Sequence, residues 1–238
     1  GTRAAQDAAA AELSAVPAPC YPPIMERFAV LLGGNLVPTG RLKAQVAGAR
    51  AIAADGGMRH AEALGLRPEL WVGDFDSTDA ALLTLYSDVP RIVLPAEKDA
   101  TDGELALREA WARGAGGAVL CGAFGGLRTD HGLLHLTMAI AEAQKGRSIW
   151  LSSGAEEAHV VLPGEQRFDL PSGAIFSIIG YGDLEGLSLR GAKWPLDQVH
   201  VPFGSSLTLS NEVTGPLTIL LGSGRAILLI SFNDRRRF

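Results

Sequence analysis

From residue 27 to about residue 151, short apolar runs alternate with longer segments of helix-like periodicity. The apolar runs cover residues 28–32, 51–54, 70–72, 92–94, 118–121 and 148–151, and the helix-like segments cover residues 57–64, 79–86, 104–113 and 130–144. Short strands that alternate with helices indicate a parallel sheet with helices on both faces. We therefore predict an α/β fold for this part of the chain, with a doubly wound, mainly parallel sheet and flanking helices.

The pattern changes after residue 152, where strand-like runs recur at short intervals without a clear helix-period segment. These runs cover residues 159–162, 167–170, 175–179, 187–190, 207–209, 217–221 and 226–230. Short strands separated by turn residues are typical of a small antiparallel sandwich or barrel. We predict an α/β domain over residues 27–152 and a C-terminal all-β sandwich domain over residues 156–238. A tail or extension over residues 1–26 precedes them.

The composition excludes several classes of protein. Acidic residues outnumber basic ones by 26 to 21, and the net charge of −5 offers no basic surface to nucleic acid or to an anionic membrane. No uncharged apolar run approaches the roughly 18 residues that span a bilayer, and residues 1–24 do not resemble a signal peptide. Two cysteines are too few for a disulfide framework or a structural zinc site. We expect a globular protein in a reduced, cytoplasmic setting, with no nucleic-acid or membrane partner.

The chemically informative residues follow the predicted strands. In a doubly wound sheet, ligands bind just beyond the carboxyl ends of the strands. Four predicted strands are followed by carboxylates or glycines, in the segments 55–57 (Asp-Gly-Gly), 73–77 (Gly-Asp-Phe-Asp-Ser), 98–104 (Lys-Asp-Ala-Thr-Asp-Gly-Glu) and 122–126 (Gly-Ala-Phe-Gly-Gly). Because these strand ends meet at one edge of the sheet, we expect the four segments to form one site.

Asp74 and Asp76 point to a metal ion. They are two residues apart in a segment expected to be extended, so their side chains should leave on the same side. Paired carboxylates without histidine or cysteine suit Mg²⁺, and Asp102 supplies a third from the next strand end. The alternative is that one of the two aspartates caps the following helix. We favour the metal, because clustered carboxylates repel one another unless a positive charge neutralises them.

The segment Thr101-Asp102-Gly103-Glu104 also matches a helix N-terminal capping box, in which Thr101 and Glu104 satisfy the first backbone donors. Glu104 is also spaced to pair with Arg108 on a solvated helix face. Thr101 and Glu104 are therefore expected to be structural. Asp99 and Asp102 are not needed by the box and stay functional candidates.

Glycines in 122–126 let a phosphate approach the backbone closely, and the helix expected from about residue 129 offers amide donors at its N-terminus. Arg128, just before that helix, has the fork that clamps phosphate bidentately. His131 fits a ligand role and a helix residue paired to a carboxylate equally well. The other histidines show no metal-ligand spacing and are expected to be structural: His60, His135, His159 and His200. By residue type alone, Trp194 would be a core side chain and Ser210-Asn211 a turn.

In their order and spacing, these motifs resemble those of the thiamine pyrophosphokinase family. The resemblance rests on the segments 55–57, 73–77 and 98–104 and on Arg128-Thr129-Asp130-His131, and it runs from about residue 28 to residue 230. In the second half, Gly191-Ala192-Lys193-Trp194 and Ser210-Asn211 resemble the family's Gly-x-Lys-Trp and Ser-Asn stretches. One departure is Leu127, which separates Gly126 from Arg128 where the family usually has Gly-Gly-Arg-x-Asp-His.

The resemblance implies an N-terminal α/β nucleotide-binding catalytic domain, a C-terminal β-sandwich that binds thiamine, and a homodimer with active sites at the subunit interface. It also implies Mg²⁺-dependent transfer of the pyrophosphoryl group of ATP to the hydroxyethyl group of thiamine, which releases AMP. Asp74, Asp76 and Asp102 would hold Mg²⁺ on the triphosphate. Asp55, Asp130 and Asp102 would be the catalytic carboxylates, with Asp55 and Asp130 close to the reacting groups.

The same resemblance implies the binding residues. Those for ATP and its phosphates would be Gly56, Gly57, Lys98, Asp99, Thr101, Gly125, Gly126 and Arg128. Those that frame thiamine, from the same or the partner subunit, would be Trp194, Ser210 and Asn211.

Three other functions remain as alternatives. Residues 74–78 fit the D-x-D-x-T motif of phosphatases with an aspartyl nucleophile, but the late acidic residues Asp183 and Glu185 do not follow another parallel strand and helix. A metal-dependent nucleotide-sugar transferase would explain Asp-x-Asp but not the other motifs. A non-catalytic nucleotide- or thiamine-binding module would have no reason to retain three metal-directed acids.

Overall fold

The structure is a computed structural model that describes residues 27–76, 78–93, 99–126 and 128–232. Its first half contains, in order, β1 (Arg27–Leu31), α2 (Gly40–Val46), β2 (Arg50–Ala54), η1 (Asp55–His60), α3 (Ala61–Leu64), β3 (Leu70–Gly73), α4 (Ala80–Leu85), β4 (Arg91–Val93), α5 (Asp102–Ala112), β5 (Gly117–Cys121), α6 (Thr129–Gln144) and β6 (Ser148–Ser152). Its second half contains β7 (Glu156–Val161), β8 (Gly164–Phe168), β9 (Ile175–Gly180), β10 (Leu184–Ala192), β11 (Leu196–Val201), β12 (Asn211–Leu221) and β13 (Ala226–Ser231).

The first six strands form a parallel sheet in the order β6-β5-β1-β2-β3-β4, and every pairing between neighbours in it is parallel. All six predicted strands are confirmed. The order changes direction at β1, because β2, β3 and β4 extend to one side and β5 and β6 to the other. That is the arrangement of a doubly wound sheet, which places ligand sites at the carboxyl ends of its strands.

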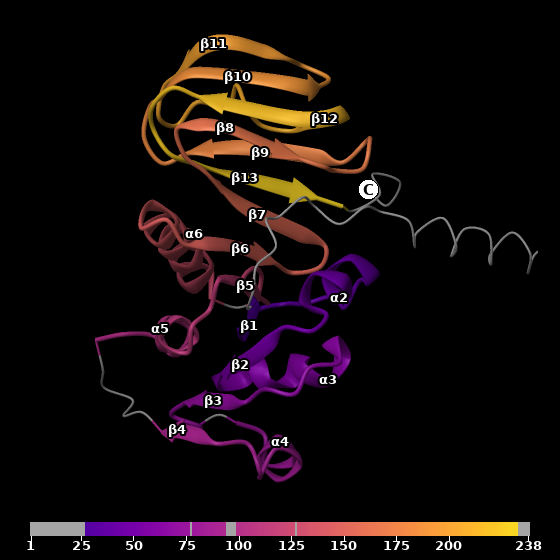
Figure 1. Ribbon diagram of the computed structural model, residues 1–238, viewed down its shortest axis with the longest axis vertical. Helices are drawn as coiled ribbons and strands as arrows, with labels where there is room; N and C mark the ends of the chain where they lie inside the picture. Colours follow the sequence, from indigo (N-terminus) through magenta and orange to yellow (C-terminus); the bar gives the residue numbers. More distant parts are fainter. Residues whose placement is uncertain (1–26, 77, 94–98, 127, 233–238) are drawn as a thin grey trace, which may run out of the picture.

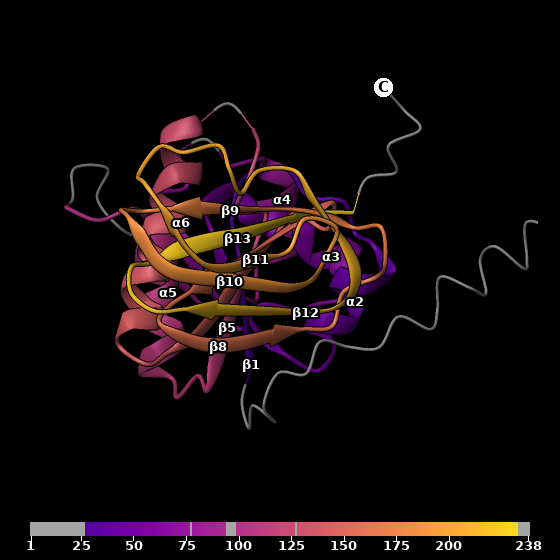
Figure 2. The same ribbon diagram turned by 90° about the horizontal axis from the view of Figure 1, so that it is seen from above.

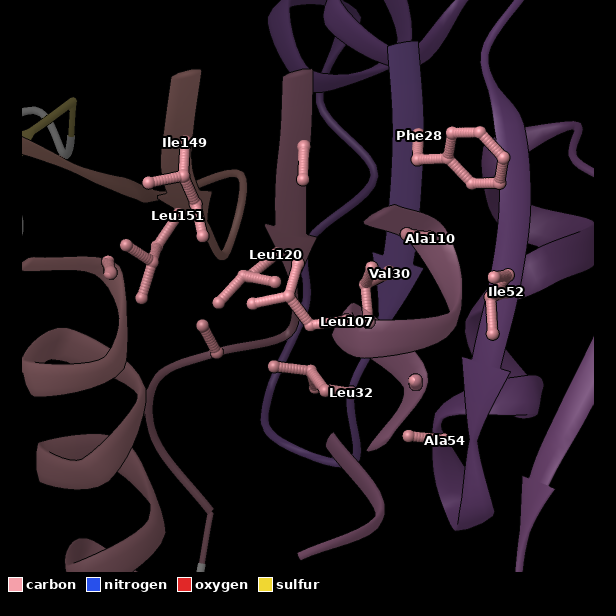
Figure 3. Packing of buried hydrophobic residues seen from close by; sticks show 14 of the residues in the cluster. Phe28, Val30, Leu32, Ile52, Ala54, Leu107, Ala110, Leu120, Ile149 and Leu151 are labelled. Atoms are coloured by element: carbon pink, nitrogen blue, oxygen red, sulfur yellow. The ribbon is translucent and has the colours of Figure 1, made fainter. Parts of the chain in front are cut away.

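Helices cover both faces of this sheet, as the alternation of buried side chains requires. On one face, Phe28 and Val30 of β1 pack against Leu107 and Ala110 of α5 in a core that also includes α6 (Figure 3). On the other face, Leu31 packs in a second core with residues of α2 and α3. In both ribbon views α5 and α6 lie on one side of the parallel strands, and α2 and α3 lie on the other (Figure 1 and Figure 2).

The second half is antiparallel and continues the same sheet. β6 pairs with β7, β7 with β13, β13 with β9 and β9 with β12, all antiparallel. β12 then pairs with β8 and β10, and β10 pairs with β11. A separate apolar core fills the space between these strands, with contributions from β9, β10, β12 and β13. The expected sandwich is therefore present, and a hydrogen-bonded seam at β6 and β7 joins it to the α/β half (Figure 1).

The structure differs from the local expectations in four places. The strand predicted at 207–209 is wrong, because Leu207 and Leu209 are 58% and 47% exposed and only Thr208 turns inward, donating its hydroxyl to Ile178 O. Helix α2 and edge strand β11 were not predicted. The helix expected over 57–64 begins earlier, as the 3-10 helix η1, and becomes α-helical only at α3. Within the described residues, no helix combines the length and the apolar character that crossing a membrane requires.

Candidate active site

A pocket of about 830 Å³ opens at the carboxyl edge of the parallel sheet. Its walls come from the ends of β1, β2 and β3, the segment before and at the start of α5, and the first half of α6. The described residues that line it are Leu32, Gly33, Ala54, Asp55, Gly56, Arg59, Asp74, Asp99, Ala100, Thr101, Asp102, Gly103, Glu104, Arg128, His131, Leu134 and His135. Segments far apart in the sequence thus meet where the topology of the sheet places a ligand.

Asp55 directly follows the carboxyl end of β2 and has a strained backbone conformation. It is the first residue of η1 and has φ of 42°, in the left-handed region that non-glycine residues seldom adopt. Its carbonyl accepts a hydrogen bond from Trp71 Nε1 at 2.9 Å, and its Oδ1 accepts one from Thr78 Oγ1 at 3.2 Å. A Cβ on Gly73 would lie only 3.2 Å from Asp55 Cα, so this glycine lets β3 lie closely alongside. Such strain is common at functional sites, where surrounding contacts maintain it.

The two aspartates after β3 do not share one orientation. Asp74 lines the pocket, whereas Asp76 is exposed and donates its backbone N–H to Asp74 Oδ1 at 3.2 Å. The expectation of an extended segment is wrong here, because Phe75 between them has φ of 63° and packs edge-on against Trp71. The cap of α4 is instead Asp79, whose Oδ1 accepts from Ala81 N at 2.8 Å. The alternative explanation of Asp74 and Asp76 as helix caps is therefore not needed.

Carboxylates gather around the pocket without forming a closed metal cage. Asp55, Asp74, Asp99 and Asp102 all line it. Among the residues that the structure describes, however, no three histidine, cysteine or acidic side chains are grouped closely enough to hold a metal ion. The pocket thus offers oxygen ligands from several strand ends, with room for a ligand between them.

Helix α5 enters the site through its capped N-terminus. Thr101 Oγ1 accepts a hydrogen bond from Glu104 N at 3.2 Å, which is the threonine's half of the expected capping box, and the Glu104 carboxylate pairs with Arg108 as expected on a solvated face. A Cβ on Gly103 would lie 2.9 Å from Leu32 Cδ2, so the first turn packs directly on the end of β1. This packing brings Thr101 and Asp102 to the pocket wall.

The predicted glycines have two different placements. Gly56 lines the pocket, whereas Gly57, Gly125 and Gly126 do not belong to its described lining. A Cβ on Gly57 would lie 2.1 Å from Leu31 O, and one on Gly125 would lie 2.9 Å from Asn35 Nδ2. Gly57 is therefore needed where two backbones pass each other closely, and Gly125 is needed for its φ of 64° and its contact with the Asn35 side chain. Lys98, predicted to bind phosphate, lies outside the described residues.

Arg128 and Asp130 pair with each other at the start of α6. Arg128 Nε and Nη2 donate to the two carboxylate oxygens of Asp130 at 3.0 and 2.8 Å, and both side chains are 65% exposed. These hydrogen bonds hold the pKa of Asp130 well below its usual range and raise the pKa of Arg128. Arg128 lines the pocket, and Asp130 is not part of the described lining.

Two buried histidines fix the loops beneath the pocket. His60 Nε2 lies 2.9 Å from Gly34 O, and His135 Nδ1 lies 3.0 Å from Ala123 O. Burial lowers the pKa of both rings, so they are neutral near pH 7. Their structural role agrees with the expectation from sequence. His131 lines the pocket and makes an edge-to-face contact with His135, with 6.3 Å between the ring centroids.

The three residues predicted to frame thiamine lie together on the sandwich. Asn211 Oδ1 accepts from Trp194 N at 3.1 Å, and Asn211 Nδ2 donates to Trp194 O at 2.8 Å. Ser210, just before it, has φ of 56°. The expectation of a core tryptophan is wrong, because Trp194 is 54% exposed. None of these three lines the pocket of the α/β half described above.

Arg59 lines the pocket, and sequence reasoning missed it. It lies on η1, two residues after the Asp-Gly-Gly segment, and its Nη2 donates to the carbonyls of Gly33 and Gly34. The only signal in the sequence was a cation close to a predicted strand end.

Comparison with known proteins agrees with this geometry. Residues 46–151 match the family model for the thiamin pyrophosphokinase catalytic domain, and residues 161–224 match the model for the thiamin pyrophosphokinase vitamin B1 binding domain. The chain is also 31% identical over 153 residues to thiamine pyrophosphokinase of Bacillus subtilis, an alignment that spans 63% of this chain and 71% of the relative. The chain belongs to the thiamine pyrophosphokinase family.

Solved structures of family members have the same fold. The crystal structure of thiamine pyrophosphokinase from Bacillus subtilis matches with a TM-score of 0.76 and 25% identity, over 88% of this chain and 100% of that one. A thiamin pyrophosphokinase family protein from Enterococcus faecalis matches with a TM-score of 0.72 and 28% identity, over the same shares. The Candida albicans enzyme, at 12% identity and a TM-score of 0.70 over 87% of this chain and 89% of that one, supports the fold alone. The match to the catalytic model includes Asp55, Asp74 and Asp102, and the match to the vitamin-binding model includes Trp194 and Asn211.

Proposed function

We propose that this chain transfers the pyrophosphoryl group of ATP to thiamine in a Mg²⁺-dependent reaction, giving thiamine diphosphate and AMP. The observation that carries the proposal is the pocket at the carboxyl edge of the sheet, which collects Asp55 and Asp74 from the ends of β2 and β3 and Asp102 from the start of α5, in a member of this kinase family. Phosphoryl transfer asks a protein mainly for positioning and for neutralisation of charge. A pocket of carboxylates and guanidinium groups supplies both.

In this reaction the hydroxyl oxygen of thiamine attacks the β-phosphorus of ATP in line. The bond from the β-phosphorus to the oxygen that bridges it to the α-phosphorus breaks, and AMP leaves with that oxygen. The hydroxyl proton passes to a carboxylate, for which we propose Asp55. Two observations support Asp55 over Asp130: Asp55 lines the pocket, and Asp130 is held ionised by Arg128.

The donor set fits Mg²⁺. Asp74 and Asp102 contribute carboxylate oxygens to one pocket, without a competing thiol among the lining residues. Mg²⁺ commonly takes one or two protein carboxylates and completes its shell with water and substrate phosphates, so a pocket without a three-carboxylate cage suits an ion that binds together with ATP. When bound, Mg²⁺ would neutralise the triphosphate and fix its orientation. Asp76, exposed beside Asp74, is proposed as a further ligand through water.

We assign the phosphate chain to the wall formed by Gly56, Asp99, Thr101 and Arg128, all of which line the pocket. Gly57 would act through its close approach to the backbone of Leu31, and Gly125 and Gly126 through the positive φ angles that they adopt in the loop after β5. Lys98 is also assigned to the phosphate chain, because it lies in the motif at residues 98–104.

We assign thiamine recognition to Trp194, Ser210 and Asn211, in a homodimer. In this proposal residues 27–152 form the nucleotide-binding domain and residues 156–238 the thiamine-binding domain. These three residues lie outside the described pocket lining, and in this proposal the sandwich of a second copy brings them to it. Exposed apolar side chains on the sandwich, Phe203 and Leu207 among them, supply a surface for that contact. A cytoplasmic location, where ATP is plentiful, completes the proposal.

The phosphatase alternative gains no support from the geometry. Thr78, which would be the threonine of the D-x-D-x-T motif, donates to Asp55. The late acids lie in the antiparallel half, where Asp183 accepts from Phe203 N and Glu185 pairs with His200. Neither belongs to the described lining of the pocket.

The test is product identification after purified protein is mixed with Mg-ATP and thiamine. We expect equal amounts of AMP and thiamine diphosphate, lost in Asp74→Asn and kept in the matched control Asp88→Asn, whose side chain pairs with Arg67 at the surface. ADP with thiamine monophosphate would overturn the reaction. Inorganic phosphate alone would establish a hydrolase, and saturable binding without products would establish a binding module.

A further inference from the structure

Arg59 is a cation in the pocket wall to which the motifs assign no role. Its Nη2 donates to the carbonyl of Gly33 and, at 3.1 Å, to the carbonyl of Gly34. A Cβ placed on Gly56 would lie 3.5 Å from its Nη1. The guanidinium therefore spans from the loop after β1 to the first turn of η1, and its side chain is exposed and lines the pocket.

The charges around the pocket set Arg59 apart. The described lining contains the carboxylates of Asp55, Asp74, Asp99, Asp102 and Glu104, and the guanidinium groups of Arg59 and Arg128. Arg128 uses two of its nitrogens on the carboxylate of Asp130. Within the described residues, the hydrogen bonds of Arg59 go to neutral backbone carbonyls, and those bonds use one nitrogen. Its positive charge and the donors on Nη1 and Nε are thus available to a ligand.

A purely structural role does not account for this arrangement, because the Gly33–Gly34 loop is held in place by other contacts. Gly34 N donates to Gly122 O at 2.9 Å, and Asn35 N donates to Phe124 O at 2.9 Å. Gly34 O also lies 2.9 Å from His60 Nε2. The loop is therefore tied to the neighbouring strand end independently of Arg59.

We propose that Arg59 binds the phosphate chain of the nucleotide, with its side chain oriented in advance by the two carbonyls. Arginine presents donors in a rigid fork that matches phosphate oxygens, and a side chain that is already anchored loses less conformational freedom on binding. The acidic lining favours such a cation, since carboxylates repel an entering triphosphate and each positive group in the wall offsets part of that repulsion. This inference rests on the proposed function, because it concerns the same pocket and the same nucleotide.

The experiment compares calorimetric binding of three probes to wild-type protein and variants: Mg-ATP, Mg-tripolyphosphate and adenosine. In Arg59→Gln we expect the dissociation constants of Mg-ATP and Mg-tripolyphosphate to rise by about tenfold or more, as for the loss of a charged hydrogen bond. The dissociation constant of adenosine and the KM for thiamine should stay unchanged. Arg59→Lys keeps the charge without the guanidinium fork, so its dissociation constants for Mg-ATP and Mg-tripolyphosphate should lie between those of the wild type and Arg59→Gln. The matched control is Arg67→Gln, whose exposed side chain pairs with Asp88 and should change none of these values.

Several results would overturn the inference. Unchanged tripolyphosphate binding in Arg59→Gln would exclude a phosphate contact, and an equal loss for adenosine and tripolyphosphate would indicate a collapsed pocket wall. A wild-type protein that binds neither ATP nor tripolyphosphate would overturn both this inference and the proposed function. A wild-type protein that makes no thiamine diphosphate, yet loses tripolyphosphate binding in Arg59→Gln, would overturn the proposed function and support the inference.

Discussion

Arg128 donates hydrogen bonds from Nε and Nη2 to the two carboxylate oxygens of Asp130, at 3.0 and 2.8 Å, at the first turn of α6. The arrangement links two residues with separate expected tasks, one to bind phosphate and one to act beside the reacting groups. Because the guanidinium lowers the pKa of Asp130, that carboxylate is a poor proton acceptor while the pair persists. Arg128 can engage a phosphate fully only by sharing or releasing its partner. The pair therefore acts as a unit.

The two aspartates should respond differently to removal of their charge. We expect Asp55→Asn to lower kcat by about 10²–10⁴-fold, the usual contribution of a general base. Asp130→Asn should lower kcat less, because Arg128 already occupies both oxygens of that carboxylate. Measuring kcat of both variants at saturating Mg-ATP and thiamine checks this. A larger loss of kcat in Asp130→Asn than in Asp55→Asn would reverse the assignment.

A buried ion pair should make stability depend on pH. Glu157 is 1% exposed and accepts from Arg41 Nε at 2.6 Å and from Gln45 Nε2 at 2.7 Å. Burial alone would raise the pKa of Glu157, but hydrogen bonds from His159 and Arg41 lower it to about 2. The unfolded chain, with a pKa of about 4.3 for this group, binds its proton first as the pH falls. The stabilisation is therefore complete above that value and is lost as the pH falls toward the folded-state pKa.

We accordingly expect Glu157→Gln to reduce the free energy of unfolding by about 3–5 kcal/mol at neutral pH, as when one partner of a buried pair is removed. The difference from wild type should shrink as the pH is lowered below about 4. Urea denaturation at several pH values provides the measurement. The exposed pair of Glu165 and Arg167 supplies the control, because Glu165→Gln should cost about 1 kcal/mol or less. A constant difference across pH would show that packing, not charge, is what Glu157 contributes.

Gly34 should tolerate no side chain. A Cβ there would lie 2.3 Å from Gly122 O and 2.6 Å from Phe124 O, and both atoms belong to backbone that cannot move aside cheaply. We expect Gly34→Ala to reduce the free energy of unfolding by about 1–3 kcal/mol, the usual range for overpacking, and to weaken nucleotide binding. Gly40, where an added Cβ would meet nothing within 4 Å, is the comparison site. Equal thermal stability of Gly34→Ala and Gly40→Ala would disprove the close packing of these loops.

A shared active site should allow two damaged subunits to rescue each other. Asp74→Asn removes a pocket carboxylate, and Trp194→Ala removes an exposed side chain of the sandwich. Each homodimer should be nearly inactive, but mixed dimers would contain one site with both residues intact. Random re-association should then restore about a quarter of wild-type activity, because half of the dimers are mixed and each has one complete site. Activity that stays at the level of the separate variants would place both residues in one subunit's site.

The sheet was predictable because burial on both faces gives β1, β2, β3, β5 and β6 continuous apolar runs, whereas the edge strand β4 is mostly exposed. Strand β11 escaped prediction for the opposite reason: it is an edge strand, mostly exposed, with no clear alternation. Helix α2 has only seven residues, although Thr39 caps it by accepting from Leu42 N. The false strand at 207–209 shows the reverse error, since leucines that alternate with polar residues can face solvent in a turn segment.

The candidate site was predictable as a set of strand ends, but not in its detailed geometry. The convergence of Asp55, Asp74 and Asp102 follows from topology alone. The separation of Asp76 from Asp74 depends on the positive φ of Phe75, which an assumption of extended backbone cannot anticipate. Arg59 was missed because its partners are backbone carbonyls of the loop after β1, a tertiary contact without a sequence motif.

The most direct test of the proposed reaction follows one oxygen atom. ATP would carry a heavy oxygen isotope in the bridge between the α- and β-phosphorus atoms, and the products formed with thiamine and Mg²⁺ would be analysed by mass spectrometry. Attack at the β-phosphorus predicts that all of the label appears in AMP and none in thiamine diphosphate. Label recovered in ADP beside thiamine monophosphate, or label in AMP beside inorganic pyrophosphate with thiamine unchanged, would contradict pyrophosphoryl transfer by this chain.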